Sequence, residues 1–302
     1  MRPDDIRPLN DHRCLLGESP LWHPDEQVLY SVDIPGRQVL RWRDGADAPD
    51  IWPQDAEPGC IAARTGGGLI VARRDGLWTL DTTSGALNAL APPPYNPAEQ
   101  RYNDGKPDAL GRLWVATLSD ARRPEAALYR IDAEGPAPQV TGITVGNGLA
   151  WSPDGRTLYA SDTKAHAVYR HDFEVATGAI GPRQVFARFA ERNTAQPLDA
   201  YGGRPDGAAV DAEGCYWVAM FEGQRLVRLS PQGAVLSELR LPVRCPTMPC
   251  FGGPDGRTLF ITTARDKRPV EELAAQPWAG AVLSLRVDVP GLPANRCVLA
   301  AH

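Results

Sequence analysis

The stretch GNGLAWSPDGRTLYASD, residues 146–162, contains the unit that decides the fold. It reads as an apolar strand, a tight turn and a second apolar strand. The turn and the strand after it occur six times, and the copies begin at His23, Thr65, Asp108, Ser152, Asp211 and Gly253. Successive copies are 42, 43, 44, 59 and 42 residues apart. Five copies have Gly at the fourth position, where a tight turn needs a positive φ, and only Glu26 departs from this rule.

Each repeat has room for four short strands, since AVYRHDF and RQVFARF follow the turn motif within the fourth copy. Four strands in about 40–45 residues are typical of a propeller blade. We therefore predict an all-β, six-bladed β-propeller that forms a single domain over residues 1–302. A two-sheet sandwich would not repeat one turn motif so regularly.

The same pattern predicts several details of the ring. The 59-residue interval indicates a longer loop within residues 190–204, and residues 265–280 could hold one helical turn. A strand near residues 6–13 is expected to pair with the last blade and close the ring. Trp114, Trp151 and Trp217 stand close to the turn motifs and are interpreted as core residues between blades.

Composition excludes several classes of protein. The 302 residues carry a formal charge of −5 and contain no long run of Lys or Arg, which argues against nucleic-acid or anionic-membrane partners. No apolar run approaches the ~20 residues of a membrane span, and the first residues lack the apolar core of a secretory signal. Six scattered cysteines form no C-x-x-C pair, so we expect reduced thiols and a cytoplasmic location.

The repeat also predicts a site. The fifth residue before each turn motif should lie on a ring around the central channel, and these residues are Glu18, Cys60, Asn103, Asn147, Asp206 and Met248. Four of the six carry oxygen, and two are carboxylates that would repel each other unless a cation lies between them. The alternative is that these side chains only cap strand ends. Oxygen ligands without histidine favour Ca²⁺, Mg²⁺ or Mn²⁺.

With these segments in view, the chain resembles the senescence-marker-protein/gluconolactonase/regucalcin-like family. The matching stretches are LGESPLWHPDEQVLYSVD, RYNDGKPDALGRLWVAT, GNGLAWSPDGRTLYASD, RPDGAAVDAEGCYWVAM and TMPCFGGPDGRTLFITTAR, between residues 16 and 265. The resemblance implies a six-bladed propeller that binds one divalent cation at the channel mouth and hydrolyses sugar lactones. The resemblance does not specify the identity of the cation, which could be Ca²⁺, Mg²⁺, Mn²⁺, Zn²⁺ or Fe²⁺.

The resemblance also implies roles for individual residues. Glu18, Asn147 and Asp206 would be the metal ligands, while Arg101 and Asn103 would contact the substrate. The loop TLSDARRPEAALYR differs from that of the animal members, so the roles of Asp120, Arg122 and Glu125 are not carried over.

Chemistry then suggests a mechanism, in which a bound divalent cation polarises the lactone carbonyl and Asp206 is the candidate general base. Two other functions stay open. A metal-dependent esterase or organophosphate hydrolase on the same scaffold would have a more apolar mouth. A non-enzymatic cation-binding propeller would need no Arg101. The sequence does not specify the particular lactone or the oligomeric state.

Overall fold

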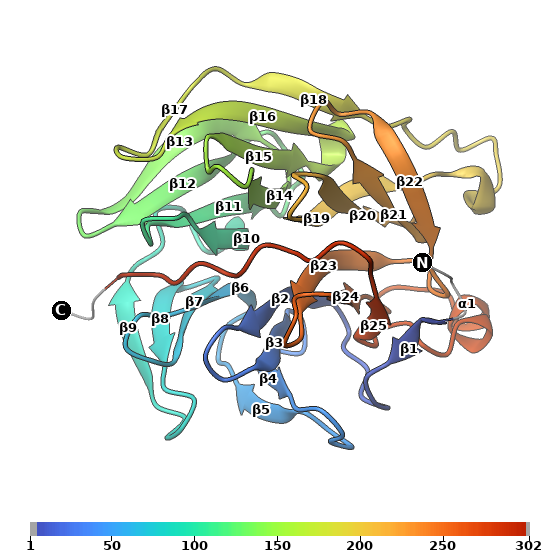
Figure 1. Ribbon diagram of the computed structural model, residues 1–302, viewed down its shortest axis with the longest axis horizontal. Coiled ribbons are helices and arrows are strands. Elements are labelled where there is room, and N and C mark those ends of the chain that lie inside the picture. Colours follow the sequence, from blue (N-terminus) through green and yellow to red (C-terminus); the bar gives the residue numbers. More distant parts are fainter. Residues whose placement is uncertain (1–4, 300–302) are drawn as a thin grey trace.

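The computed structural model describes residues 5–299, which form six antiparallel sheets arranged around a central channel (Figure 1). The expected all-β, six-bladed propeller is therefore confirmed. Among the described residues, the fold contains the α-helix α1 (Val270–Ala275) and the 3-10 helices η2 (Thr163–Ala165) and η3 (Leu198–Ala200). None of the helices in residues 5–299 has the length and apolar character needed to cross a membrane.

The first three blades follow one another along the chain. Blade one comprises β2 (Gly17–His23), β3 (Val28–Asp33), β4 (Gln38–Trp42) and β5 (Asp50–Pro53). Blade two comprises β6 (Pro58–Ala63), β7 (Leu69–Arg73), β8 (Gly76–Leu80) and β9 (Leu87–Ala91). Blade three comprises β10 (Gln100–Pro107), β11 (Leu113–Ser119), β12 (Ala126–Asp132) and β13 (Gly135–Ile143).

The last three blades include the two irregular ones. Blade four comprises β14 (Gly146–Trp151), β15 (Thr157–Asp162) and β16 (Ala167–Glu174), with β17 (Ala179–Ile180) and β18 (Gln184–Arg188) both paired to β16. Blade five comprises β19 (Arg204–Val210), β20 (Tyr216–Phe221), β21 (Arg225–Leu229) and β22 (Val235–Arg240). Blade six comprises β23 (Pro246–Gly252), β24 (Thr258–Thr263), β25 (Leu283–Arg286) and β1 (Arg7–Pro8).

The predicted closure is confirmed, because β1 pairs with β25 through Arg7 opposite Ser284 and Pro8 opposite Leu283. The predicted helical turn is α1, and the predicted long loop follows β18 and contains η3. The glycines at the fourth motif position all have positive φ; they are Gly68, Gly111, Gly155, Gly214 and Gly256. In the first copy the positive φ falls one residue later than the motif predicts, on Gln27 at 52°.

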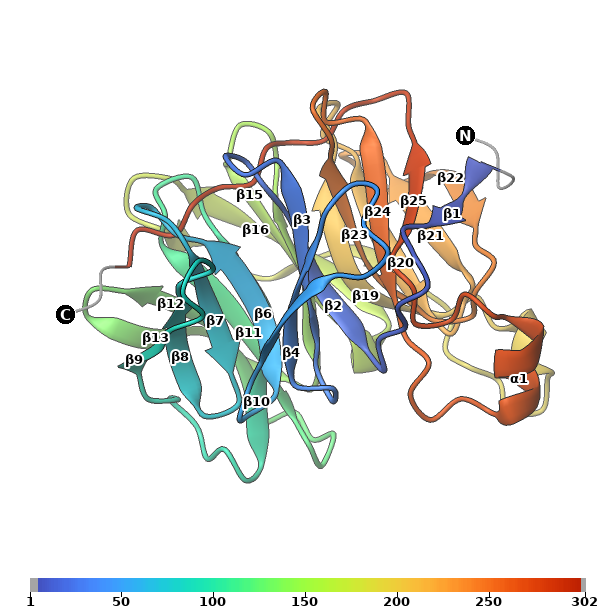
Figure 2. The same ribbon diagram turned by 90° about the horizontal axis from the view of Figure 1, so that it is seen from below.

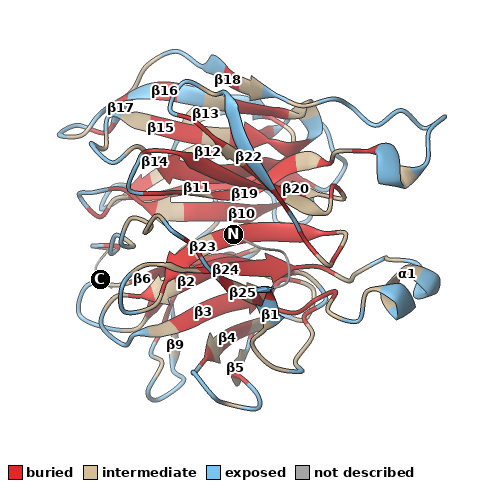
Figure 3. Ribbon diagram, turned by 45° about the vertical axis from the view of Figure 1, so that its right-hand side comes forward, coloured by how far each residue is buried: buried red, intermediate tan, exposed pale blue. Residues whose placement is uncertain are grey.

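The core lies between blades. Each of six buried apolar clusters joins two neighbouring blades, so every blade is held by both neighbours. Trp114 of blade three meets Trp151 of blade four at 6.4 Å between ring centroids, and Trp217 of blade five meets Phe251 of blade six at 5.9 Å. The three tryptophans are thus the interblade residues that the sequence predicted. Burial falls from the innermost strands toward the outermost strands (Figure 3).

A C-terminal strap, residues 289–298, crosses the ring after the last strand (Figures 1 and 2). It binds the backbone of blades two, three, five and six, through Ala63, Thr65, Gly111, Val210, Ala212 and Gly256. Most of these contacts lie at or just beyond the C-terminal ends of β6, β10 and β19. The strap therefore covers the end of the channel where these innermost strands finish. We call this the strap end and the opposite end, where the innermost strands begin, the site end.

Candidate active site

The innermost strand of every blade has a β-bulge or irregularity beside the ring position. In blade four, for example, the regular pairing shifts between Asn147 and Ala150. A bulge bends the strand and re-aims the side chains next to it. The strands run along the channel, and the repeated bulge therefore explains how their polar side chains converge at the site end.

Three neighbouring blades connect through these side chains. Asn103 Nδ2 of blade three donates to Asn147 Oδ1 of blade four at 2.7 Å, and Asn147 Nδ2 donates to Asp206 Oδ1 of blade five at 2.6 Å. Arg101 Nη1 donates to Asn103 Oδ1 at 2.7 Å and so extends the chain. Asn147 Nδ2 also donates to Thr163 Oγ1 at 2.8 Å. The structure thus joins four of the five predicted site residues in one hydrogen-bonded row.

Glu18, from blade one, completes the predicted set. Its side chain is buried, and its Oε2 accepts a hydrogen bond from Ser19 N at 3.1 Å. Burial raises the pKa of Glu18 well above its usual value, and the nearby charges of Asp206 and Asp104 raise it further. The remaining ring positions hold Cys60 and Met248, which are buried and apolar as the sequence suggests.

Asp206 shows the same effect of burial. Desolvation raises the pKa of Asp206 to about 7, against the opposing charge of Arg204. Neither Asp206 nor Glu18 forms an ion pair with any residue in the range 5–299. Two buried carboxylates without a neutralising partner are costly, and a cation bound between them removes that cost.

Asp104 is a further buried acid beside the site, and the sequence gives it no individual role beyond its place in the Arg101, Asn103 and Asp104 cluster that favours a polyol substrate. Its Oδ2 accepts from Leu149 N at 2.8 Å, whereas its Oδ1 is buried without a hydrogen-bond partner among the described residues. Burial raises the pKa of Asp104, and the charge of Lys106 lowers it. The only signal in the sequence is its place directly after Asn103, at the bulge of β10.

Arg101 is buried at the same site. Its side chain is buried, and Nη1 donates to Tyr102 O at 2.9 Å as well as to Asn103. Burial lowers the pKa of Arg101 to about 10, so the guanidinium stays charged at neutral pH. Its other donors form no hydrogen bond within residues 5–299 and are free for a ligand.

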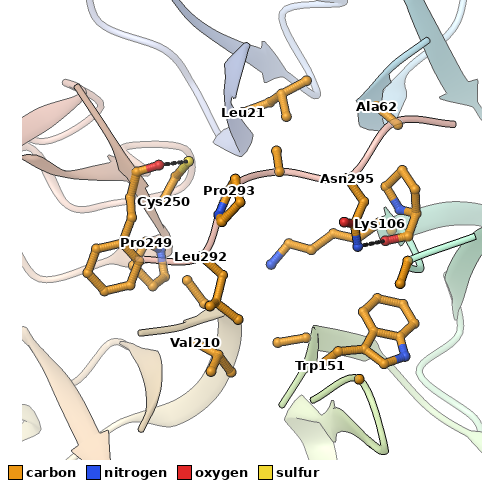
Figure 4. Close-up of a pocket in the computed structure, with 18 of the residues that line it drawn as sticks. Leu21, Ala62, Lys106, Trp151, Val210, Pro249, Cys250, Leu292, Pro293 and Asn295 are labelled. Carbon is orange, nitrogen blue, oxygen red and sulfur yellow. Dashed lines mark hydrogen bonds between the residues drawn. The ribbon is translucent and has the colours of Figure 1, made fainter. Parts of the chain in front are cut away.

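A cavity of about 330 Å³ lies nearer the strap end (Figure 4). Glu18, Asn103, Asn147 and Asp206 do not line it, and its wall includes Leu292 and Pro293 of the strap. Lys106 extends into the cavity (Figure 4). Its Nζ donates to Ala208 O. Because the strap covers this space, it is not the mouth of the predicted site.

A second group of potential metal ligands, Asp211, Glu213 and Cys215, lies on the turn of blade five. Asp211 Oδ2 accepts from Trp217 Nε1 at 2.8 Å, and Arg228 Nη2 donates to both acids at 2.7 Å. These carboxylates are already neutralised by Arg228. They stabilise a turn, in contrast to Glu18 and Asp206.

Comparison with known proteins identifies the family. The model of the SMP-30/gluconolactonase/LRE-like region matches residues 16–265. The chain belongs to this family. This chain is 45% identical over 281 residues to a 6-deoxy-6-sulfogluconolactonase of Pseudomonas putida. The match covers 92% of this chain and 93% of that protein. Regucalcin of Danio rerio is 33% identical over 284 residues, 92% of this chain and 93% of that one.

Solved structures agree with this family assignment. The crystal structure of a calcium-binding regucalcin from Agrobacterium tumefaciens superposes with a TM-score of 0.89 at 25% identity, covering 97% of each chain. The family therefore shares this six-bladed architecture.

Proposed function

We propose that the protein is a metal-dependent hydrolase of sugar lactones. The observation that carries the proposal is the convergence of Glu18, Asn147 and Asp206 at one end of the channel, with both carboxylates buried and unpaired. The names of the relatives support the same reaction, since one is a sulfogluconolactonase and another structure is described as calcium-binding.

The donor set suits a hard divalent cation. Glu18 and Asp206 supply carboxylate oxygens, and Asn147 supplies an amide oxygen with two lone pairs, of which the bond from Asn103 occupies one. Ca²⁺, Mg²⁺ and Mn²⁺ prefer such all-oxygen ligands. When bound, the cation would polarise the lactone carbonyl and stabilise the charge that develops on its oxygen.

The residues of the chain supply the rest of the mechanism. Arg101 and Asn103 hold the hydroxyl groups of the sugar ring and orient the carbonyl. Asp206 takes a proton from the attacking water as the new C–O bond forms. When the ring C–O bond breaks, the same carboxyl returns that proton to the alkoxide oxygen.

The two alternative functions receive less support. An esterase for apolar substrates would have an apolar mouth, whereas Arg101 keeps guanidinium N–H donors without a partner in residues 5–299 and Asn103 Oδ1 keeps one lone pair beside its bond from Arg101. A purely cation-binding propeller has no use for a buried arginine beside its metal ligands, and burying that charge is costly.

The decisive experiment measures lactone hydrolysis over a cation titration after treatment with a chelator, corrected for spontaneous hydrolysis. We expect no activity above background in chelator and recovery with added cation. Asp206→Asn retains an oxygen donor but cannot accept a proton, so its kcat at saturating cation should stay about 10²–10⁴-fold low.

Asn147→Ala is the matched control, because an amide can ligate but cannot act as a base. It should need more cation and then recover much of its kcat. Full activity in chelator would refute the metal requirement. Near-parental kcat of Asp206→Asn at high cation would make Asp206 a ligand only.

A further inference from the structure

The cavity at the strap end is separated from the candidate active site by packed side chains at the level of the ring. A Cβ on Gly105 would lie 2.7 Å from Cys60 Sγ, and a Cβ on Gly207 would lie 2.4 Å from Met248 Cβ. Cys60 and Met248 therefore fill the space that these two glycines leave. Since Gly105 and Met248 also belong to the wall of the cavity, the cavity begins where this packing ends.

The wall of the cavity is mostly apolar. Its polar residues are Ser19, Lys106, Ser152, Asp154 and Asn295. Ser19 Oγ accepts a backbone N–H at 3.0 Å, and Ser152 Oγ donates to Asp154 Oδ1 at 2.6 Å. These three side chains thus already have partners. Lys106 and Asn295 keep hydrogen-bonding capacity for a ligand, and Figure 4 shows them together on one side of the space.

Lys106 brings a positive charge into this apolar space. Its side chain points toward the middle of the cavity in Figure 4. The ammonium has three N–H donors, and the hydrogen bond to Ala208 O is the one that it forms within residues 5–299. In the same range no carboxylate forms an ion pair with it. Burial lowers the pKa of Lys106 and the charge of Asp104 raises it, so a further anion beside the ammonium would offset more of the cost of burial.

Lysine is rare in this chain. Of the 32 basic residues only three are lysines, namely Lys106, Lys164 and Lys267. Lys164 and Lys267 are exposed, so the remaining lysine is the one that faces the cavity. An ammonium is compact and its donors rotate, whereas a guanidinium is a broad, rigid fork. The residue type therefore suits a small space with one ligand group to hold.

The strap has a segment over the cavity that its backbone does not fasten. Gly291 N donates to Gly256 O at 2.9 Å, and Cys297 N donates to Ala63 O at 2.7 Å. Between these anchors, residues 293–296 form no backbone–backbone hydrogen bond with the part of the chain that the structure describes. Segments with few backbone hydrogen bonds open at low cost. A ligand can therefore enter beneath this segment while both anchors stay in place.

We infer that the strap-end cavity binds a small organic monocarboxylate with an apolar body, whose carboxylate accepts hydrogen bonds from the Lys106 ammonium. The cavity of about 330 Å³ is within the range of small-molecule sites, and a mostly apolar wall with one or two polar groups is typical of them. A sugar would leave most of its hydroxyl groups unpaired there, and a phosphate would face a single cation. The inference does not depend on the proposed function, because no candidate active-site residue lines the cavity.

The test is calorimetry of the full chain with two pairs of probes, benzoate against benzamide and hexanoate against hexanamide. Each pair differs in charge and keeps the same apolar body. We expect a Kd below about 1 mM for at least one carboxylate, and binding at least about 10-fold weaker for its amide. Acetate, which has no apolar body, should not bind. The titration is made in chelator and again with Ca²⁺, and the affinity should be the same.

Lys106→Met should abolish the preference for the carboxylate, because methionine keeps an apolar side chain of similar length without the ammonium. Lys267→Met is the matched control, since the Lys267 side chain is 90% exposed, and it should bind as the parent does. Arg101→Ala should also bind as the parent does, since Arg101 belongs to the candidate active site. Leu292→Trp adds bulk to the cavity wall from the strap and should weaken carboxylate and amide alike.

Several results would overturn the inference. They are no binding of either carboxylate by the parent, equal affinity for a carboxylate and its amide, or binding that requires Ca²⁺. Unchanged binding in Lys106→Met, or its loss in Arg101→Ala, would likewise place the carboxylate elsewhere. If Lys106→Met does not fold, the comparison of Leu292→Trp with Arg101→Ala decides between the cavity and the candidate active site.

Discussion

Asp206 carries a free-energy cost that depends on pH. Its pKa is about 7 in the fold against 3.8 in an unfolded chain, because burial disfavours the charged form. Between these values the folded state holds more protons than the unfolded state, so the free energy of unfolding falls as pH rises. The cost is absent below about pH 4 and complete above about pH 7. A bound cation would offset it.

Asp206→Asn should therefore stabilise the cation-free protein at pH 8, by on the order of 1–4 kcal/mol. The advantage should fade toward pH 4, where the parent carboxyl is protonated. With saturating cation the order should reverse, because the variant loses a charged ligand. Thermal unfolding in chelator and in cation, at both pH values, checks this.

Asp154→Asn is the control for that series, since Asp154 is an exposed carboxylate whose pKa is lowered by a hydrogen bond from Ser152. It should give no stabilisation at pH 8. A less stable Asp206→Asn protein in chelator at that pH would contradict the cost assigned to the buried charge.

At the scale of single elements, β14 shows how a bulge sets a side chain. Gly148 follows Asn147 and has φ +64°, and its carbonyl accepts from Tyr216 Oη at 2.7 Å. A Cβ at this position would lie 2.3 Å from Tyr216 Oη and 2.8 Å from Ser161 Oγ. The close approach of blades four and five beside Asn147 thus requires glycine.

Gly148→Ala should displace Asn147 and lower both cation affinity and kcat. Gly155→Ala is the matched control, because Gly155 has nearly the same φ, +69°, while its nearest contact for a Cβ is Val175 Cγ2 at 3.5 Å. The control should lose about 1–2 kcal/mol of stability from its backbone conformation alone and keep its activity. Equal activity losses in the two variants would mean that crowding at Gly148 does not matter.

The register of the repeat explains how much of the fold and of the candidate site could be predicted from the sequence. One turn motif fixed the blade boundaries, and counting back from it placed Glu18, Asn103, Asn147 and Asp206 at one height, because equivalent residues of a propeller share a radius and a level. The bulges were only partly predictable, since four of them contain or border a glycine (Gly59, Gly105, Gly148 and Gly207) whereas those of blades one and six do not. Without them, the burial of Asp104 and the order of bonds from Arg101 to Asp206 could not be derived.

The ion pairs at the site end escaped prediction for a different reason. Arg204 lies two residues before the counted position of Asp206, and its partner Glu222 also contacts Arg268, 64 positions away, which has Glu272 as a second acid. Arg122 lies on a turn, where spacing carries no information on direction. Such features depend on contacts between blades rather than on the repeat.

The C-terminal strap holds the blades of the ring together. It hydrogen-bonds blades that are not neighbours, for example through Val298 N to Gly111 O at 3.0 Å and Ala212 N to Pro290 O at 2.8 Å. Cys297 is fully buried between blades two and three, and Arg296 pairs with Asp25 of blade one. The strap therefore opposes separation of the blades and covers the channel cavity.

Deletion of residues 289–302 should remove these contacts and lower Tm by roughly 3–6 °C, from the loss of about 2–4 kcal/mol. Activity well below the new Tm should persist, because the strap and the candidate active site occupy opposite ends of the channel. Deletion of residues 300–302 alone is the control, since it leaves every described strap contact in place. An unchanged Tm in the longer deletion would show that the strap contributes no stability.

Blade six has a consequence for how the protein is made. Its outermost strand, β1, leaves the ribosome before every other strand of the ring that the structure describes, while its partner β25 leaves after all of them. Translation proceeds at about 5–20 residues per second, so β1 waits many seconds for its partner while finished blades accumulate. During that wait the growing chain exposes open sheet edges, which invite pairing with other chains. A stop codon just before β25 would thus leave the other described strands of the ring in place and still give no closed ring.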